Sequence, residues 1–166
     1  MEKIFNSPLP PFDPFQKIGK EWALLAASHD GKTNAMTVSW GECGVLWNKN
    51  VVSVFVRPQR YTKALIDKSG IITLSFFDES FRSTLTYFGR NSGRDTDKFA
   101  DTGLKKELDS DGAVILPEAS LSLKCRVIYT SEIRPENFHD SSLMKNYEAL
   151  DFHTVYTCEI IGVYQK

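Results

Sequence analysis

The sequence contains only three cysteines among its 166 residues, Cys43, Cys125 and Cys158. They are odd in number and far apart, and no C-x-x-C pair occurs, which argues against a disulfide framework or a cysteine zinc site. The three histidines, at positions 29, 139 and 153, fit no metal-ligand spacing either. We therefore expect no metal, and reduced thiols in a cytoplasmic protein.

The chain also lacks an excess of charge of either sign and any long apolar run. Lys and Arg number 20 and Asp and Glu number 21, so the net charge is −1 and the basic surface of a nucleic-acid binder is missing. No stretch approaches the roughly 18 apolar residues of a membrane span, and the N-terminus does not read as a signal peptide. Neither G-x-G-x-x-G nor a P-loop occurs, so the usual support for a nucleotide-binding α/β fold is absent.

What is present is the composition of one globular domain with a proline-rich beginning. Hydrophobic residues make up 42% of the chain. Four prolines fall within residues 5–15, a density that does not favour a helix or a central strand. We expect residues 1–19 to form an extended arm that packs on its own domain or on a partner subunit, and residues 20–166 to form a single domain.

Hydrophobic patterning in that domain favours β-structure. Strands are predicted at 22–28, 35–40, 51–57, 71–77, 114–117, 120–133 and 153–164, and short helices at 61–69 and 80–88. Asp30-Gly31 predicts a hairpin turn between the first two strands. Because hairpins dominate and βαβ units are missing, we expect a mainly β fold, an antiparallel barrel with a few short helices.

One segment points to an anion. Between a predicted strand and a predicted helix, the chain reads Arg57-Pro58-Gln59-Arg60-Tyr61-Thr62-Lys63, with no acidic residue before Asp67. A helix N-terminus normally favours Asp or Glu, and a cationic first turn makes sense if an external anion supplies the negative charge. Arginine suits phosphate because its planar fork donates two parallel hydrogen bonds. The alternative is a solvated basic turn.

Three other groups of residues carry weaker signals. The polar loop from Arg90 to Lys98 could contact a ligand, with Gly93 letting the backbone approach, or it could be a solvated loop that ends in an Asp helix cap. The stretch 34–37 could offer backbone groups to a flat ligand or be a plain strand. Trp40 and Trp47 could stack on a ring or fill core.

Four ordered motifs resemble the flavin reductase-like, FMN-binding split-barrel family, and most of all its flavoredoxin-type branch. The first comprises Ala23–Ser28, Gly31 and Asn34–Trp40. The others are Val56–Thr62, which is similar to the family's phosphate-binding turn; Ser92–Asp95 with Lys98; and Phe152–Tyr156 followed by Glu159 and Ile160. Together they cover about residues 20 to 164.

The resemblance implies a six-stranded antiparallel split β-barrel of Greek-key type, a homodimer, and FMN bound non-covalently near the dimer interface. It places twelve residues at the cofactor: Asn34, Met36, Thr37, Ser39 and Trp40 along the ring and ribityl chain, Arg57, Arg60, Tyr61 and Thr62 at the phosphate, and Ser92, Gly93 and Lys98 on the loop side. His153 would lie near the ring or the nicotinamide as the candidate catalytic residue. The chain departs from the family at Cys158, where relatives often have glycine, and in residues 134–151, a variable region that often shapes the substrate side.

These expectations lead to one main hypothesis and two alternatives. The main one is a reductase in which NADH or NADPH passes electrons to FMN and FMN passes them to an unknown acceptor. Its residues would position the cofactor and the nucleotide, and no acid–base pair would be needed. The first alternative is an FMN-binding electron carrier or storage module without NAD(P)H activity. The second is a barrel for another phosphate-bearing ligand, such as pyridoxal phosphate or a haem-linked compound.

Overall fold

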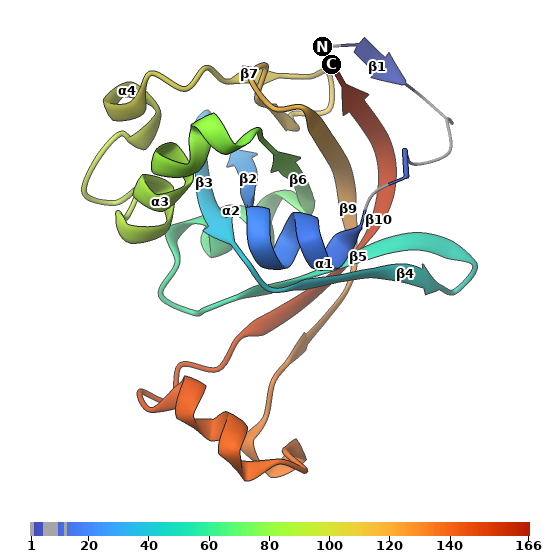
Figure 1. Ribbon diagram of the computed structural model, residues 1–166, viewed down its shortest axis with the longest axis vertical. Helices are drawn as coiled ribbons and strands as arrows, with labels where there is room; N and C mark the ends of the chain where they lie inside the picture. The colour runs from blue at the N-terminus through green and yellow to red at the C-terminus, as the bar shows by residue number, and fades with distance from the viewer. Residues whose placement is uncertain (1, 5–9, 12) are drawn as a thin grey trace.

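The computed structural model describes residues 2–4, 10–11 and 13–166, and it is built around one antiparallel sheet (Figure 1). The sheet has the strand order β3-β2-β6-β9-β10-β5-β4, with β1 paired to the far end of β10. Its strands are β1 (Glu2–Ile4), β2 (Ala23–His29), β3 (Lys32–Val38), β4 (Gly41–Leu46), β5 (Lys49–Val56), β6 (Ile71–Phe76), β9 (Leu121–Glu132) and β10 (Thr154–Gln165). The pair β7 (Glu107–Leu108) and β8 (Val114–Ile115) is separate.

The helical segments of the described chain are short. They are α1 (Pro14–Gln16), the π-helical turn η1 (Lys17–Glu21), α2 (Tyr61–Ser69), the 3₁₀ turn η2 (Glu79–Phe81), α3 (Arg82–Arg90), α4 (Lys98–Thr102) and the 3₁₀ turns η3 (Pro135–Asn137) and η4 (Ser141–Tyr147). None of them is long and apolar enough to cross a membrane. The expected mainly β, antiparallel class with a few short helices is confirmed, although the described strands exceed the six expected.

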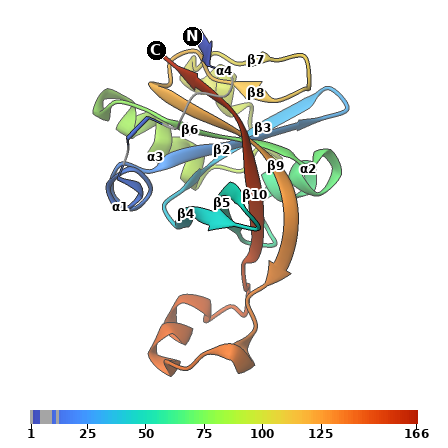
Figure 2. The same ribbon diagram turned by 90° about the vertical axis from the view of Figure 1, so that its right-hand side faces the viewer.

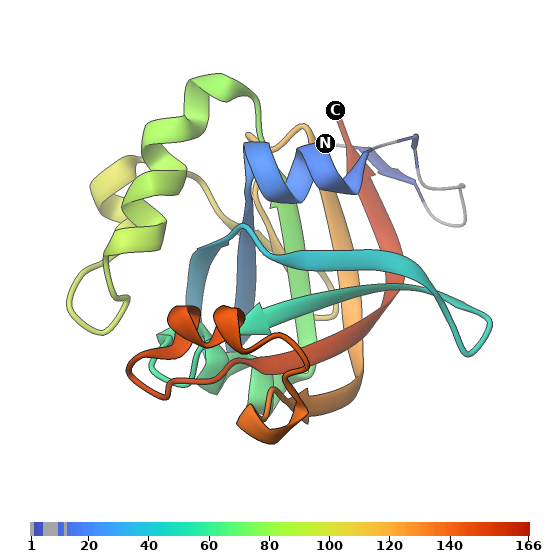
Figure 3. The same ribbon diagram turned by 60° about the horizontal axis from the view of Figure 1, so that its bottom comes forward.

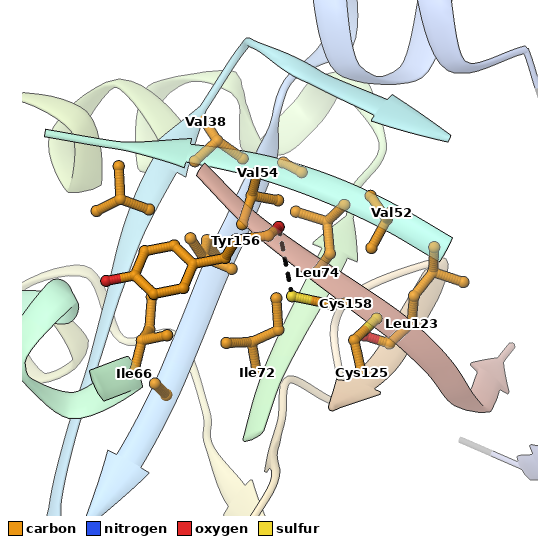
Figure 4. Packing of buried hydrophobic residues seen from close by; sticks show 14 of the residues in the cluster. Val38, Val52, Val54, Ile66, Ile72, Leu74, Leu123, Cys125, Tyr156 and Cys158 are labelled. Carbon is orange, nitrogen blue, oxygen red and sulfur yellow. Dashed lines mark hydrogen bonds between the residues drawn. The ribbon is translucent and has the colours of Figure 1, made fainter. Parts of the chain in front are cut away.

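The sheet coils until its two ends share one core. Val38 of β3 and Val54 of β5 come from opposite ends of the strand order, yet both belong to the same buried cluster, together with Leu74, Leu123 and Tyr156 from the strands between them (Figure 4). A second cluster covers the outer face of β2 and β3, where α3, α4 and β8 contribute side chains. Strand β2 is therefore buried on both faces, which explains its continuous apolar run.

The predicted first hairpin is confirmed, and its turn has the expected chemistry. Strands β2 and β3 pair in register from Ala23↔Val38 to His29↔Lys32. The two turn residues, Asp30 and Gly31, both have positive φ, 48° and 73°. A two-residue turn with two left-handed residues matches the twist of the strands, so this turn fixes the register of β3.

Two local predictions were wrong. Gly41–Leu46 was not predicted as a strand, because it carries two glycines and its turn is Trp47-Asn48, without an Asp-Gly or Asn-Gly signal. The prediction that residues 1–19 are extended was also wrong in part, because a helix begins at Pro14. The side chain of Asp13 accepts the N–H of Phe15 at 2.9 Å, and proline is tolerated at the first helical position. At the other end of the arm, Glu2–Ile4 form β1 and pair with β10 of the same domain, which is one of the two expected alternatives. Residues 1, 5–9 and 12 of the arm lie outside the described residues.

One segment leaves the sheet. Residues 133–153, which connect β9 to β10 and contain η3 and η4, extend away from the strands as a separate lobe (Figures 1 and 2). We call this segment the excursion. It contains residues 134–151, the region that the resemblance led us to expect to vary. It ends at His153, directly before β10, so contacts that hold the excursion in place also bear on the position of His153.

Candidate functional site

Two adjoining pockets gather nearly all the candidate site residues. The first, which we call the cationic pocket, is lined by Asn34, Met36, Gln59, Arg60, Tyr61, Thr62, Arg90, Asn91, Ser92, Gly93 and Lys98. The second, the aromatic pocket, is lined by Met36, Thr37, Val38, Ser39, Trp40, Phe55, Arg57, Arg60 and His153. Met36 and Arg60 line both, so the two pockets form one elongated site.

The chain enters the cationic pocket through a tight turn. Pro58 ends β5, and the N–H of Arg60 donates to the carbonyl of Arg57 at 3.1 Å, which turns the chain into α2. Arg60 is the N-cap of α2, no side chain caps that end, and the first turn has no acidic residue. The positive end of the helix therefore faces the site without a carboxylate of its own.

A half-buried arginine and a buried lysine meet in this pocket. Arg60 donates to the carbonyl oxygens of Gly89 (2.8 Å) and Phe88 (3.3 Å) at the end of α3. Lys98, which is 2% exposed, donates to the carbonyl oxygens of Ala35 (2.5 Å) and Phe88 (3.2 Å). Burial, and then repulsion by Arg60, lower the pKa of Lys98 to about 8. Burial also lowers the pKa of Arg60.

Among the described residues, no acid lines the cationic pocket, although Arg60, Arg90 and Lys98 all do. A cation as deeply buried as Lys98 is normally paired, because an unpaired buried charge is costly. Here carbonyl oxygens provide only partial negative charge, so a bound anion would complete the pairing. A phosphate group fits this donor set, with a guanidinium, an ammonium, the Thr62 hydroxyl and the start of α2.

Gly93 is where the loop comes closest to β3. A Cβ at this position would lie 2.2 Å from Oδ1 of Asn34, so no larger residue fits without displacing that side chain. Asn34 is buried and donates from Nδ2 to Oγ1 of Thr62 at 2.9 Å. From the same loop, Arg94 donates to the Gln59 carbonyl at 2.8 Å. The loop 91–97 is thus fastened over the start of α2, and Asp97 caps α4 as the solvated-loop alternative also expected.

The aromatic pocket has a half-exposed ring at its mouth and a buried imidazole on its wall. Trp40 is 46% exposed, and its ring centroid lies 5.3 Å from that of His153. Phe55 packs edge-on against His153 at 6.4 Å. His153 is 6% exposed, and burial, followed by repulsion from Arg57, lowers its pKa to about 4. The imidazole is therefore neutral at pH 7.

Arg57 stands apart from the other phosphate candidates. Its guanidinium pairs with the carboxylate of Asp151 at 2.5 Å and donates to the Asn146 carbonyl at 2.9 Å, both in the excursion. It lines the aromatic pocket but not the cationic pocket. The structure thus brings Arg60, Tyr61 and Thr62 together and places Arg57 on the other side of Arg60.

Six of the remaining candidates fall where the sequence grouped them: Ser92, Gly93 and Lys98 line the cationic pocket, and Thr37, Ser39 and Trp40 line the aromatic one. Asn34, which was grouped with the ring side, lines the cationic pocket instead.

Sequence reasoning did not include five residues that line the pockets, namely Val38, Phe55, Gln59, Arg90 and Asn91. It also missed Tyr147 and Asp151, which contact His153 and Arg57. Arg90 and Asn91 belong to the polar loop already singled out, but nothing local marked Tyr147 or Asp151. Within the described residues, no group of His, Cys, Asp and Glu could hold a metal ion.

Known proteins resemble this chain in sequence profile and in fold. The profile of the flavin reductase like domain matches residues 15–166. The structure of flavoredoxin from Methanosarcina acetivorans superposes with a TM-score of 0.71 at 24% identity, over 88% of this chain and 68% of that one. The FMN-binding protein from Thermus thermophilus with bound p-hydroxybenzaldehyde superposes with a TM-score of 0.69 at 19% identity, and the match covers 100% of this chain and 82% of that chain.

A second flavoredoxin, from Desulfovibrio vulgaris, gives a TM-score of 0.69 at 20% identity and covers 100% of this chain and 77% of that chain. At such identities these structures establish the fold alone. A putative flavin reductase with a split barrel domain from Shewanella frigidimarina gives 0.70 at 21% identity, over 89% of this chain and 67% of that one, so the split-barrel class is shown. Among curated proteins, none matches this sequence.

Proposed function

The chain belongs to the flavin reductase-like family, and we propose that it is an FMN-dependent oxidoreductase that accepts electrons from NADH or NADPH. The FMN phosphate would occupy the cationic pocket and the ring would extend into the aromatic pocket. One observation carries the proposal: the half-buried Arg60 and the buried Lys98 line one pocket that has no acidic residue among its described lining residues. A phosphate supplies the missing charge, and the shared residues Met36 and Arg60 lead from it to the flat, aromatic half of the site.

Each group of residues has a separate task in this proposal. Arg60, Lys98, Thr62 and the start of α2 bind the phosphate, and Gly93 allows the loop to approach the ligand. The backbone of β3 around Met36 and Thr37 runs along the ligand, while Trp40, Phe55 and His153 shape the space on the ring side. Bound FMN supplies the redox chemistry, so the protein needs to bind, orient and exclude water rather than to provide an acid–base pair.

The homodimer is a further part of the proposal. Val45, Leu46 and Trp47 are exposed at the tip of the β4–β5 hairpin, and Trp40 is exposed at the mouth of the aromatic pocket. Exposed apolar side chains at both ends of β4 favour a protein contact along this hairpin. Sedimentation equilibrium tests this, with a dimer mass expected and a monomer at micromolar concentration as the contrary result.

The test of the function is spectroscopic. Purified protein is loaded with FMN, freed of excess, and mixed with NADH or NADPH without oxygen. We expect flavin bands that shift on binding and bleach with one of the nucleotides. Bands that shift but do not bleach would point to the electron carrier, and no uptake of FMN would overturn the cofactor assignment.

Two variants separate the cationic residues at the site. Arg60→Ala should weaken FMN binding at least about tenfold, because charge-assisted hydrogen bonds contribute about 1.5–3 kcal/mol each. Arg57→Ala should act less on FMN affinity, since its guanidinium is engaged with Asp151. Equal losses of FMN affinity in both variants would show that Arg57 also binds the phosphate. No loss in either variant would contradict the assignment of the cationic pocket to the phosphate.

A further inference from the structure

His153 uses one of its two ring nitrogens inside the protein. Nδ1 lies 2.8 Å from the hydroxyl oxygen of Tyr147, the last residue of η4 in the excursion. The imidazole lines the aromatic pocket and is nearly fully buried. Because a neutral imidazole carries a single N–H, the partner at Nδ1 decides which nitrogen holds the proton and what the ring offers to the pocket.

The direction of this hydrogen bond follows from the partners that are available. Burial raises the pKa of Tyr147, so the phenol keeps its proton. In the described part of the chain, the Tyr147 hydroxyl has Nδ1 of His153 as its hydrogen-bond partner. If Nδ1 carried the proton, the buried O–H would be left without an acceptor, and a buried unsatisfied donor costs about 1–3 kcal/mol. The phenol therefore donates to Nδ1, and the ring proton resides on Nε2.

We propose that Tyr147 is a positioning residue that holds His153 as the Nε2–H tautomer, so that the aromatic pocket presents a neutral hydrogen-bond donor to a carbonyl or carboxamide oxygen. The proposal rests on the proposed function for its ligand, because a nicotinamide carries such an oxygen. The tautomer itself depends only on this chain.

Several contacts hold Tyr147 in place. Its ring stacks on Phe152 with centroids 4.8 Å apart and an interplanar angle of 22°. The guanidinium of Arg57 lies 5.3 Å from its ring centroid, and the same group donates to the carbonyl of the preceding Asn146 at 2.9 Å. Gln59 donates to the second oxygen of Asp151 at 2.8 Å. These contacts fasten the excursion next to the end of β5, where Tyr147 meets His153, and Figure 3 shows the excursion in front of that end of the strand.

The surroundings of the imidazole oppose its protonation on balance. Burial has the largest effect, Arg57, directly after β5, adds repulsion, and Asp151 from the excursion partly offsets it. The uncharged rings of Trp40 and Phe55 pack against the imidazole. A cationic His153 is disfavoured, so the donor offered to the pocket is neutral and suits an uncharged carbonyl oxygen better than a carboxylate.

The tautomer is tested on the protein free of FMN. In ¹⁵N-labelled protein, long-range imidazole spectra between pH 6 and 8 should show His153 with protonated Nε2 and unprotonated Nδ1. Tyr147→Phe keeps the ring but removes the hydroxyl, and should convert His153 to a mixture of tautomers. Tyr129→Phe, at an exposed tyrosine outside the site, should leave the spectrum unchanged. A protonated Nδ1 in the wild type, or an unchanged spectrum in Tyr147→Phe, would overturn the proposal.

The donor is tested with NADH on the FMN-loaded protein. Tyr147→Phe should raise KM for NADH about three- to tenfold with kcat nearly unchanged, as expected for the loss of one hydrogen bond in binding. His153→Gln retains a neutral N–H donor and should keep KM within about threefold, whereas His153→Leu should raise it as Tyr147→Phe does. Equal KM values for the Gln and Leu variants would refute the donor role. Failure of NADH to reduce the wild type would refute the proposed function and leave the tautomer result standing.

Discussion

Arg60 and Lys98 donate to the same carbonyl oxygen, that of Phe88, near the C-terminal end of α3. The two cations, Arg60 half-buried and Lys98 buried, share one acceptor although they repel each other. Burial, and then repulsion by Arg60, lower the pKa of Lys98. The partial negative charge at a helix C-terminus offsets some of that repulsion. Such an arrangement is poised to gain from a bound anion, and the first prediction follows from it.

FMN affinity should depend on the protonation of Lys98. Its pKa of about 8 in the free protein means that it is charged at pH 7 and loses its proton as the pH rises past 8. Because a phosphate prefers the charged form of the lysine, affinity should be highest near pH 7, where the phosphate is mostly a dianion, and fall above pH 8. Fluorescence titrations of FMN from pH 6 to 9.5 measure this.

Lys98→Met is the control for that titration. It keeps a side chain of similar length in a buried position, so FMN should bind more weakly and with no fall in affinity above pH 8. A wild-type profile that stays flat to pH 9.5, or a variant with the same slope, would show that Lys98 does not contact the ligand charge.

Gly93→Ala should weaken FMN binding without unfolding the protein. The added Cβ would lie 2.2 Å from Oδ1 of Asn34 and push that side chain off Thr62, on the wall of the cationic pocket. Gly44→Ala is a matched control, since a Cβ there meets nothing within 4 Å. We expect at least a tenfold loss of affinity for Gly93→Ala and less than a twofold change for Gly44→Ala. Equal affinities in the two variants would contradict the close approach.

A prediction on stability concerns a buried lysine outside the site. Lys124 of β9, 1% exposed, pairs with Asp109 at 2.6 Å and with Asp111 on the segment between β7 and β8. Without the lysine, Asp109 loses its cationic partner but keeps the donors Tyr164 and two backbone N–H groups. Lys124→Met should therefore lower the free energy of unfolding by about 3 kcal/mol, at the low end for a broken buried pair. Lys68→Met, at an exposed lysine of α2, should change it by less than about 0.5 kcal/mol in urea unfolding.

Protonation of His153 should destabilise the fold. Its pKa is lowered from 6.5 to about 4, so the unfolded chain binds more protons than the native protein between these values. The stability that comes from the neutral ring is full above pH 6.5 and falls as the pH decreases towards 4. Urea unfolding at pH 7 and pH 5 should show a larger loss for the wild type than for His153→Gln. The same loss in both would mean that His153 titrates normally.

The cationic pocket could be predicted from sequence because its signals are local. Arg60, Tyr61 and Thr62 sit at a strand-to-helix turn without acids, and Gly93 and Lys98 lie in one short polar loop. The helix start and the loop converge because both border β3. Two local patterns, together with the family resemblance, were therefore enough to indicate the residues of this pocket. Arg57 shares the first pattern, but its role depends on Asp151, which is 94 residues away in the sequence.

The part of the site around Tyr147 and His153 depends on contacts that no local sequence pattern predicts. Tyr147 lies in a segment without periodicity, and only the packing of the excursion on β5 brings its hydroxyl to His153. Strand β4 has the same difficulty, since six residues with two glycines and mostly exposed side chains become a strand only by pairing with β5. In both cases the sequence carries the residues, but tertiary packing decides what they do.

The central claim is that the cationic pocket binds the phosphate of FMN, and comparing FMN with riboflavin tests it most directly, because riboflavin has the same ring and ribityl chain without the phosphate. We expect the wild type to bind FMN at least about 100-fold more tightly than riboflavin, as two charge-assisted hydrogen bonds would give. In Arg60→Ala, most of that preference should disappear while riboflavin binding stays within about threefold. Equal affinity of the wild type for the two flavins would contradict the account.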